Sequence, residues 1–350
     1  MTPLFDVHRD LGATFTDFAG RRMPLRYRSE LAEHHAVRRA AGLFDLSHMG
    51  ELEVTGADAG RFLDHALVGR LSTLPVGRAR YTMLCHDNGG VLDDLVVYRL
   101  AELRYLVVAN AANTTVVHVM LREHADGFGV DVRDASADWA LIAVQGPAAA
   151  AMLDPGPLPY YGIRAFAVAG RDVLLARTGY TGEDGFEVYC RPADAVAVWR
   201  SLLDRGPSPA GLACRDTLRL EAGMALYGHE LSVRVTPLQA GLERVVAFDK
   251  RDFVGAAALR RQRATGGFAT LVGLVTGTRR APRAGYPVLA EGTTVGAVTS
   301  GALSPTLGHP VAMAYVATGW SAPGTRLTVD VRGTGVDAHV VTLPFYSSQR

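Results

Sequence analysis

The sequence predicts an α+β fold with antiparallel sheets, followed by a small all-β module at its carboxyl end. Three observations support this prediction. The chain has 350 residues, more than a single hydrophobic core usually accommodates, which indicates two or three domains. Strand and helix patterns are mixed as far as about residue 267, in an order that does not suit one doubly wound sheet. From about residue 268 only short strand patterns remain, separated by glycine and proline, as is typical of a barrel or a sandwich.

Composition excludes several classes of protein. A hydrophobic content of 48% with 20% charged residues is typical of a globular protein, and a net charge of +1 offers no broad basic field for nucleic acid. No apolar run is long enough to cross a bilayer, and the opening MTPLFDVHRD has no export signal. Cys85, Cys190 and Cys214 are widely spaced and odd in number, which favours a reducing, cytoplasmic location without disulfides or zinc.

Lysine usage excludes two further chemistries. Of the 36 basic residues, Lys250 is the only lysine. A pyridoxal Schiff base or a phosphate-loop lysine would have to use it, yet its context AFDKRDFVG lacks the G-x-x-x-x-G-K-[ST] pattern.

The elements of the first part follow from hydrophobic periodicity and turn residues. Ser29 is the expected N-cap of a helix over residues 29–41, in which acids precede bases. GELEVTG (50–56) alternates like a half-buried strand. Two apolar runs between residues 92 and 110 are separated by the polar AEL and predict a hairpin, and residues 113–125 predict a helix.

The later elements are predicted in the same way. They are strand 139–146, a short helix over 147–154, two strands within 166–177, strand 186–190, helix 193–204 and a last strong helix over 211–226. The arginine-rich stretch RRQRATGG (260–267) is the expected linker to the all-β module.

The strand segment GGVLDDLVVYRL (89–100) carries two adjacent acids, Asp93 and Asp94. Burying an ionised acid without a partner costs roughly several kcal/mol, so the pair calls for an explanation. Successive strand side chains point to opposite faces, so at most one of the two enters a given pocket. The other must meet water, a helix N-terminus or an arginine. The alternative is a strand end where both acids are solvated or paired with bases.

RTGYTGEDGFEVYC (177–190) has glycine at every third position, at Gly179, Gly182 and Gly185. One interpretation is a flexible hairpin loop. The other is a loop whose backbone approaches a flat ligand, with Glu187 as a fixed carboxylate at the rim. A carboxylate accepts two parallel hydrogen bonds, which matches an amidine-like edge such as that of a pterin.

GLACRDTLRLEAG places Arg215 and Arg219 on one helical face, four residues apart. They could meet the nearby acids Asp216 and Glu221, or an anionic ligand. His48 lies in DLSHMG beside Ser47, but neither an acid at a suitable spacing nor a G-x-S-x-G pattern indicates a hydrolase triad. It is therefore interpreted as a structural turn residue.

Metal and dinucleotide motifs are missing from the sequence. GHEL (228–231) lacks the second histidine of H-E-x-x-H, and His34 and His35 are adjacent on one predicted helix and poorly placed to share an ion. No G-x-G-x-x-G loop occurs.

As an ordered set, these and other segments resemble the glycine cleavage system T-protein family, the tetrahydrofolate-dependent aminomethyltransferases. The resemblance runs end to end. The segments that carry it are TPLFDVHRDLGATFTDFAG (2–20), AGLFDLSHMGE (41–51), GGVLDDLVVY (89–98), ANAAN (109–113), AVQGP (143–147), RTGYTGEDGFE (177–187), RDTLRLEAGMALYGHEL (215–231), PRAGYPV (282–288) and TSGALSPTLGHPVAMAYV (299–316).

The resemblance implies three lobes around a central tetrahydrofolate channel. An N-terminal folate-binding region would span residues 1–265, with a first lobe of about 1–50 plus 150–265 and an inserted second lobe of about 51–149. A C-terminal β-barrel domain would span residues 266–350.

The resemblance also implies a reaction. An aminomethyl group on the lipoyl arm of the partner H-protein would lose ammonia and pass its carbon to tetrahydrofolate, giving 5,10-methylenetetrahydrofolate without a metal. The catalytic positions it implies are Asp94, which would accept a folate proton and stabilise the cationic carbon, and Arg283. The folate-binding positions it implies are Glu187, Arg215, Tyr81, Asn110, Tyr180 and Arg350.

Three positions depart from the family pattern: Arg21 and Arg244 stand where tryptophan is frequent, and Gln239 replaces a common glutamate. Two relatives of this family offer alternative functions. A folate-dependent demethylase of the same superfamily would act on a free methylated amine or sulfonium. A non-catalytic folate-binding factor for iron–sulfur assembly would carry K-G-C-x-x-G-Q, and no lysine precedes a cysteine in this way here.

Overall fold

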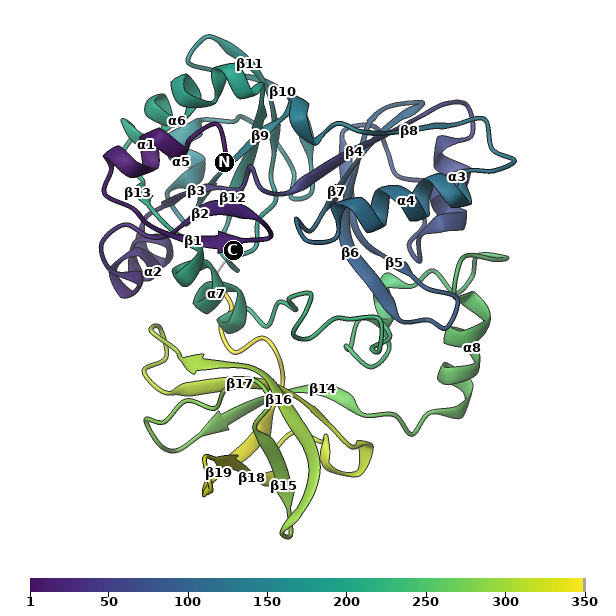
Figure 1. The fold of residues 1–350 in the computed structure, drawn as a ribbon, viewed down its shortest axis with the longest axis vertical. Helices are drawn as coiled ribbons and strands as arrows, with labels where there is room; N and C mark the ends of the chain where they lie inside the picture. Colours follow the sequence, from purple (N-terminus) through teal and green to yellow (C-terminus); the bar gives the residue numbers. More distant parts are fainter. Residues whose placement is uncertain (349–350) are drawn as a thin grey trace.

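The computed structural model describes residues 1–348, and its strands form three lobes (Figure 1). The first lobe contains a six-stranded sheet in the order β10-β11-β12-β9-β3-β13, in which only the β13–β3 pair is parallel. Its strands are β3 (Gly42–Asp45), β9 (Ala140–Gln145), β10 (Ile163–Val168), β11 (Arg171–Ala176), β12 (Gly185–Cys190) and β13 (Ser208–Pro209).

The second lobe contains a five-stranded antiparallel sheet in the order β5-β6-β7-β4-β8. The hairpin predicted between residues 92 and 110 is confirmed as the β6–β7 pair. The strands are β4 (Gly50–Thr55), β5 (Arg78–Cys85), β6 (Val91–Ala101), β7 (Arg104–Ala109) and β8 (Asp131–Asp134).

The third lobe is a closed six-stranded barrel in the order β14-β17-β16-β15-β18-β19, which confirms the predicted all-β module. Closure leaves the barrel without free sheet edges. Its strands are β14 (Thr270–Thr276), β15 (Pro287–Ala290), β16 (Thr293–Leu303), β17 (Pro310–Val316), β18 (Arg326–Val331) and β19 (Thr334–Val341).

Helices cover the sheets of the first two lobes and connect the second lobe to the barrel (Figure 1). The predicted N-cap is confirmed, because Ser29 Oγ accepts a hydrogen bond from the backbone N–H of Ala32 at 3.4 Å. The α-helices are α1 (Phe5–Asp10), α2 (Glu30–Arg39), α3 (Ala59–Ala66), α4 (Thr114–His124), α5 (Ala149–Leu153), α6 (Ala195–Leu203), α7 (Leu212–Glu221) and α8 (Ala256–Thr265).

Two helix predictions were wrong in extent. Helix α7 ends at Glu221, not at residue 226, because Gly223 adopts φ +65°, outside the helical region. Most of the stretch expected as a linker (260–267) belongs to helix α8, whose Leu259 is fully buried. Alanine, leucine, arginine and glutamine are good helix formers, and the helix ends at the two glycines that follow, Gly266 and Gly267.

A hairpin near the amino terminus was not predicted. Strands β1 (Thr14–Phe18) and β2 (Arg21–Arg26) pair antiparallel as a separate two-stranded sheet. The sheet is short and its buried residues, Met23 and Pro24, are adjacent, so it shows little of the hydrophobic alternation on which a strand prediction depends.

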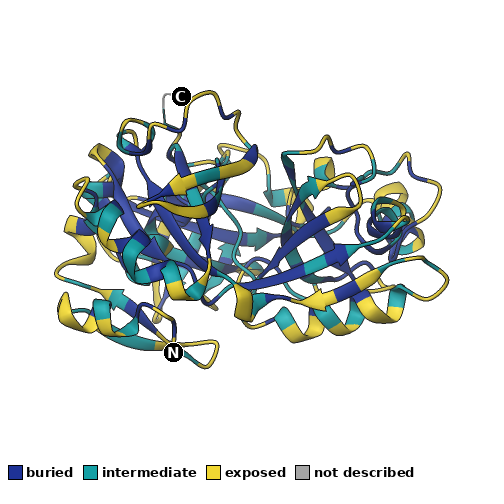
Figure 2. Ribbon diagram, turned by 90° about the horizontal axis from the view of Figure 1, so that it is seen from above, coloured by how far each residue is buried: buried dark blue, intermediate teal, exposed yellow. Residues whose placement is uncertain are grey.

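The chain passes from the first lobe to the second and back. Strand β9 pairs with β3 and β12, so the chain has returned to the first sheet at Ala140, before the boundary expected near residue 149. One apolar core joins the two sheets and includes Phe44, Tyr98 and Tyr189. Figure 2, seen from above, shows buried strands with exposed helix faces around them. The division into residues 1–265 and 266–350 stays a prediction.

Within residues 1–348, no helix combines the length and the apolar character needed to span a membrane. The same residues contain no group of three or more His, Cys, Asp or Glu side chains arranged to hold a metal ion. All three cysteines are buried as free thiols.

Candidate functional site

A cavity of about 850 Å³ lies where the three lobes meet. Its wall includes Asp94 of β6, Glu187 of β12 and Val341 of β19, one residue from each lobe's sheet. Helix α7 adds Arg215 and Arg219, and the turn of the β1–β2 hairpin also reaches the wall. The site therefore exists only when segments far apart in the sequence are assembled.

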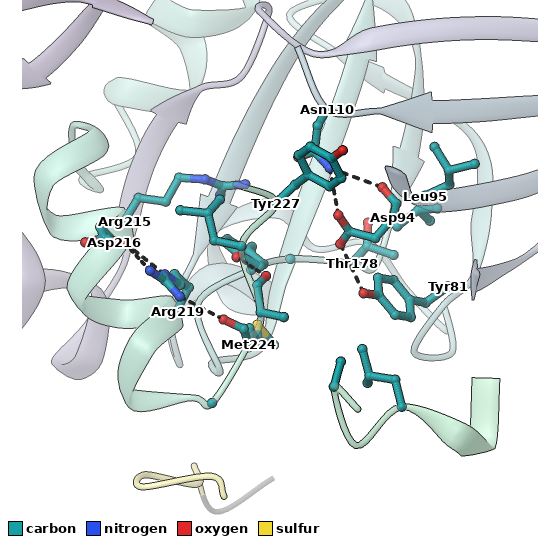
Figure 3. Close-up of a pocket in the computed structure, with 18 of the residues that line it drawn as sticks. Tyr81, Asp94, Leu95, Asn110, Thr178, Arg215, Asp216, Arg219, Met224 and Tyr227 are labelled. Atoms are coloured by element: carbon teal, nitrogen blue, oxygen red, sulfur yellow. Dashed lines mark hydrogen bonds and ion pairs between the residues drawn. The ribbon is translucent and has the colours of Figure 1, made fainter. Parts of the chain in front are cut away.

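The carboxylate of Asp94 is half-buried in this wall and held on both of its oxygens. Asn110 Nδ2 donates to Oδ1 at 2.8 Å, and Tyr81 Oη donates to Oδ2 at 3.0 Å (Figure 3). Burial raises the pKa of Asp94, while the hydrogen bonds from Tyr81 and Asn110 act in the opposite direction. Burial alone would favour the neutral acid. The two donors favour the ionised carboxylate and fix its orientation.

Glu187 lies elsewhere in the wall and is anchored through one oxygen. Thr178 Oγ1 donates to its Oε2 at 2.5 Å, and Tyr98 Oη donates to the same atom at 3.2 Å. Tyr98 and Asp94 share a face of β6 because they are four residues apart on one strand. The carboxylate is thus fixed by two hydroxyl groups, with no base bound to it in the described part of the chain.

The two arginines of α7 have different partners. Arg219 pairs with Asp216 at 2.8 Å and with Glu230 at 2.9 Å. Arg215 instead stacks on the ring of Tyr180, with Cζ 4.9 Å from the centroid, and its buried Nη1 has no hydrogen-bond partner among residues 1–348. Burial lowers the pKa of Arg215, and the charge of Glu187 acts in the other direction. An unpaired donor in a cavity wall is suited to a ligand acceptor.

Packing within the protein, and not only a ligand, explains the glycines of the loop 177–190. A Cβ at Gly179 or at Gly185 would overlap the buried side chain of Gln145. Gln145 Nε2 donates to the backbone carbonyl of Thr178 at 3.0 Å. Gly182 adopts φ +81°, which other residues rarely tolerate. The loop is therefore packed against the protein, and only Gly179 of its three glycines lines the cavity.

Most of the predicted site residues come together here. Six of them line the one cavity: Tyr81, Asp94, Asn110, Tyr180, Glu187 and Arg215. Arg283 does not line it; its side chain is exposed and donates to the carbonyl of Gly301 at 3.2 Å. The catalytic position implied for Arg283 therefore has no support from this placement. Arg350 lies outside the described residues.

Several wall residues were not predicted. Two of them, Tyr98 and Thr178, hold Glu187. Tyr98 could have been predicted, because it lies four residues after Asp94 and therefore on the same face of the strand. His48, read as structural, is buried in the wall, and burial lowers its pKa to about 4. Phe18 and Ala19 reach the cavity from the hairpin turn, which Asp17 and Gly20, both typical turn residues, could have indicated.

Comparisons with known proteins agree with this architecture. The chain matches the GCVT N-terminal domain over residues 4–250 and the glycine cleavage T-protein C-terminal barrel domain over residues 270–347. It is 58% identical to the aminomethyltransferase of Saccharopolyspora erythraea, covering 99% of this chain and 97% of that one. It is 44% identical to the aminomethyltransferase of Bacillus subtilis, covering 99% of this chain and 98% of that one.

A solved structure is similar throughout. The glycine cleavage system aminomethyltransferase T of Bartonella henselae superposes with a TM-score of 0.93 at 39% identity, covering 98% of this chain and 97% of that one. Both family models, the curated relatives and the solved structure thus agree over nearly the whole length. The chain therefore belongs to the glycine cleavage T-protein family and is an enzyme, an aminomethyltransferase.

Proposed function

We propose that this enzyme transfers the one-carbon unit of an aminomethyl group, carried on the lipoyl arm of H-protein, to tetrahydrofolate. The products are ammonia, the reduced lipoyl thiol and 5,10-methylenetetrahydrofolate. The observation that carries the proposal is the Asp94 carboxylate, held by Asn110 and Tyr81 in the wall of a cavity that three lobes build. Figure 3 shows Arg215 of α7 and Asp94 of β6 extending into the same space from different elements.

The wall fits a folate in its donor and acceptor groups. Both hydrogen bonds that Glu187 accepts from described residues end on Oε2, so Oε1 is left to accept from a ligand. Arg215 Nη1 is a buried donor without a partner within residues 1–348. A pterin edge presents N–H donors beside a carbonyl acceptor, which would satisfy both groups. Tyr180, under the Arg215 guanidinium, adds an aromatic surface.

The chemistry needs a base near the folate nitrogens. In the overall reaction the C–N and C–S bonds of the aminomethyl adduct break, and two C–N bonds to folate form. The two protons that leave the folate nitrogens balance the ammonia and the lipoyl thiol. We assign Asp94 the role of accepting a folate proton and of stabilising the cationic one-carbon unit. Glu187, Arg215, Tyr81, Asn110 and Tyr180 would hold the folate.

One reconstituted reaction tests the proposal. The protein is mixed with aminomethylated lipoyl H-protein and tetrahydrofolate, and ammonia and 5,10-methylenetetrahydrofolate are followed together. We expect equal amounts of the two products, each requiring both partners. In a parallel mixture, transfer of a one-carbon group from a free methylated amine or sulfonium to tetrahydrofolate with no need for H-protein would contradict the proposal and favour a demethylase.

A further inference from the structure

Asp93, the neighbour of Asp94, is fully buried and has no ion pair within the described chain. It is held by three N–H donors from the segment that follows β7. Asn110 donates from its backbone N to Oδ2 at 3.0 Å and from Nδ2 to Oδ1 at 2.8 Å, and Asn113 Nδ2 donates to Oδ1 at 2.7 Å. Burial, and then the charge of Asp94, raises the pKa of Asp93 to about 7. Keeping this acid in place is costly.

The amide of Asn110 is shared between the two acids. An amide nitrogen has two hydrogens. Nδ2 of Asn110 lies 2.8 Å from Asp93 Oδ1 on one side, and 2.8 Å from Asp94 Oδ1 and 3.2 Å from the Asp94 carbonyl on the other. Because Asp93 binds both the backbone and the side chain of residue 110, it fixes the side-chain torsions of Asn110. The remaining hydrogen is thereby aimed at Asp94.

We infer that Asp93 is a positioning residue, which fixes the amide of Asn110 and through it the carboxylate of Asp94. The inference rests on the function proposed for Asp94. It explains why an acid stands at position 93, since three N–H donors converge there and a carboxylate offers only acceptors. An asparagine would offer one acceptor oxygen and turn an N–H toward one of these donors.

A purely structural role for Asp93 would be to cap helix α4, which begins at Thr114. The contacts do not support that role. None of the three hydrogen bonds comes from a backbone N–H within α4, and two of them come from Asn110, four residues before the helix. Asp93 thus mainly holds Asn110, the residue that donates to Asp94, and only the Asn113 contact lies at the helix start.

The test combines turnover with binding. Asp93→Asn is compared with wild type in the reconstituted reaction, and the tetrahydrofolate Kd is measured by calorimetry. We expect kcat to fall at least tenfold while Kd changes less than threefold. The matched control is Asp131→Asn, the same substitution at an exposed position of the same sheet, for which both constants should stay at the wild-type value. Asp93→Ser, which keeps one acceptor, replaces Asp93→Asn if that variant does not fold.

A double substitution separates positioning from packing. If Asp93 acts through Asn110, then Asp93→Asn combined with Asn110→Ala should turn over no more slowly than Asn110→Ala alone, within twofold. Multiplied losses in the double variant would overturn the inference, as would a folded Asp93→Asn with wild-type kcat. Asp94→Asn is run alongside: if it keeps its turnover, the role proposed for Asp94 fails instead.

Discussion

Thr306 of the barrel donates two hydrogen bonds to Glu221 at the end of α7. Its backbone N lies 3.0 Å from Oε1, and its Oγ1 lies 2.7 Å from Oε2. Arg38 of α2 donates to the same Oε2 from Nε at 3.1 Å and from Nη2 at 2.9 Å. The Glu221 side chain is 1% exposed. The buried carboxylate of Glu221 is thus one of the contacts that join the barrel to the first lobe, at the end of the helix that carries Arg215.

Removing this charge should destabilise the protein strongly. Glu221→Gln leaves the buried guanidinium of Arg38 with Glu183 as its remaining ion-pair partner, and breaking a buried pair costs about 3–5 kcal/mol. Urea unfolding measures the loss. Asp138→Asn, which removes an exposed partner of Arg133, serves as the control and should cost about 1 kcal/mol or less. Equal costs for the two substitutions would show that Glu221 does not join the lobes as described.

Lowering the pH should weaken the same contact between Glu221 and its partners. Burial acts to raise the pKa of Glu221, but the hydrogen bond and charge of His34 and the bonds from Ser304 and Thr306 outweigh it and lower the pKa to about 2. A carboxylate with a depressed pKa stabilises the fold above its ordinary pKa, and this contribution disappears as the pH falls through the depressed value. The free energy of unfolding should therefore fall between about pH 4.5 and pH 2. In Glu221→Gln this part of the fall should be missing; an identical pH dependence would contradict the assignment.

Asp94→Asn should separate chemistry from binding. The amide keeps the size of the side chain but cannot accept a proton, so turnover should fall about 10²- to 10⁴-fold. Tetrahydrofolate affinity should stay close to that of wild type, because the binding groups Glu187 and Arg215 are untouched. Rapid-quench turnover and calorimetry measure the two effects. Parallel losses in both would mean that Asp94 only binds the folate.

Glu187→Ala should show the opposite pattern. Losing a hydrogen bond to a charged acceptor costs about 1.5–3 kcal/mol, which corresponds to roughly 10- to 150-fold weaker tetrahydrofolate binding. Tyr98→Phe removes one of the two hydroxyl groups that hold Oε2 of Glu187 but leaves its Oε1 free for the ligand, so it should weaken binding much less. An unchanged dissociation constant in Glu187→Ala would refute its assignment to the pterin edge.

Lys250, the only lysine, should resist acylation in the native protein. Its side chain is buried, and Nζ donates to the backbone carbonyls of Asp64, Leu67 and Gly69 at 2.7, 2.5 and 2.7 Å. Treatment with an amine-reactive ester followed by peptide mass spectrometry should find the Lys250 peptide unmodified before denaturation and labelled after it. Rapid labelling of the native protein would show that these three contacts open readily.

The sequence predicts those parts of the molecule whose signals are local. Two apolar runs located β6 and β7, and an N-cap serine located α2, because each pattern lies within one element. The acids at positions 93 and 94 could be recognised as unusual from their apolar neighbours. Strand geometry alone predicted that at most one of them enters the cavity, and of the two only Asp94 lines it.

Contacts across the fold could not be predicted in this way. Nothing near Asn110 indicates that its amide divides between two acids, and nothing near Gly179 indicates that Gln145 fills the space beside it. Arg283 is the opposite case, in which the sequence implied a role that the placement of the side chain does not support. Its position in the chain implied a catalytic role, whereas the barrel turns that side chain toward solvent and the carbonyl of Gly301.

The shared cavity has a consequence for the lifetime of the enzyme. A molecule seated there touches three lobes at once, so its binding free energy opposes their separation as well as its own release. Without that molecule this restraint is lost, and the lobes are held together by their own contacts, such as the apolar core shared by the two sheets and the hydrogen bonds of Glu221. If the molecule is the proposed folate, its supply in the cell would affect how readily proteases degrade the protein as well as how fast the enzyme works.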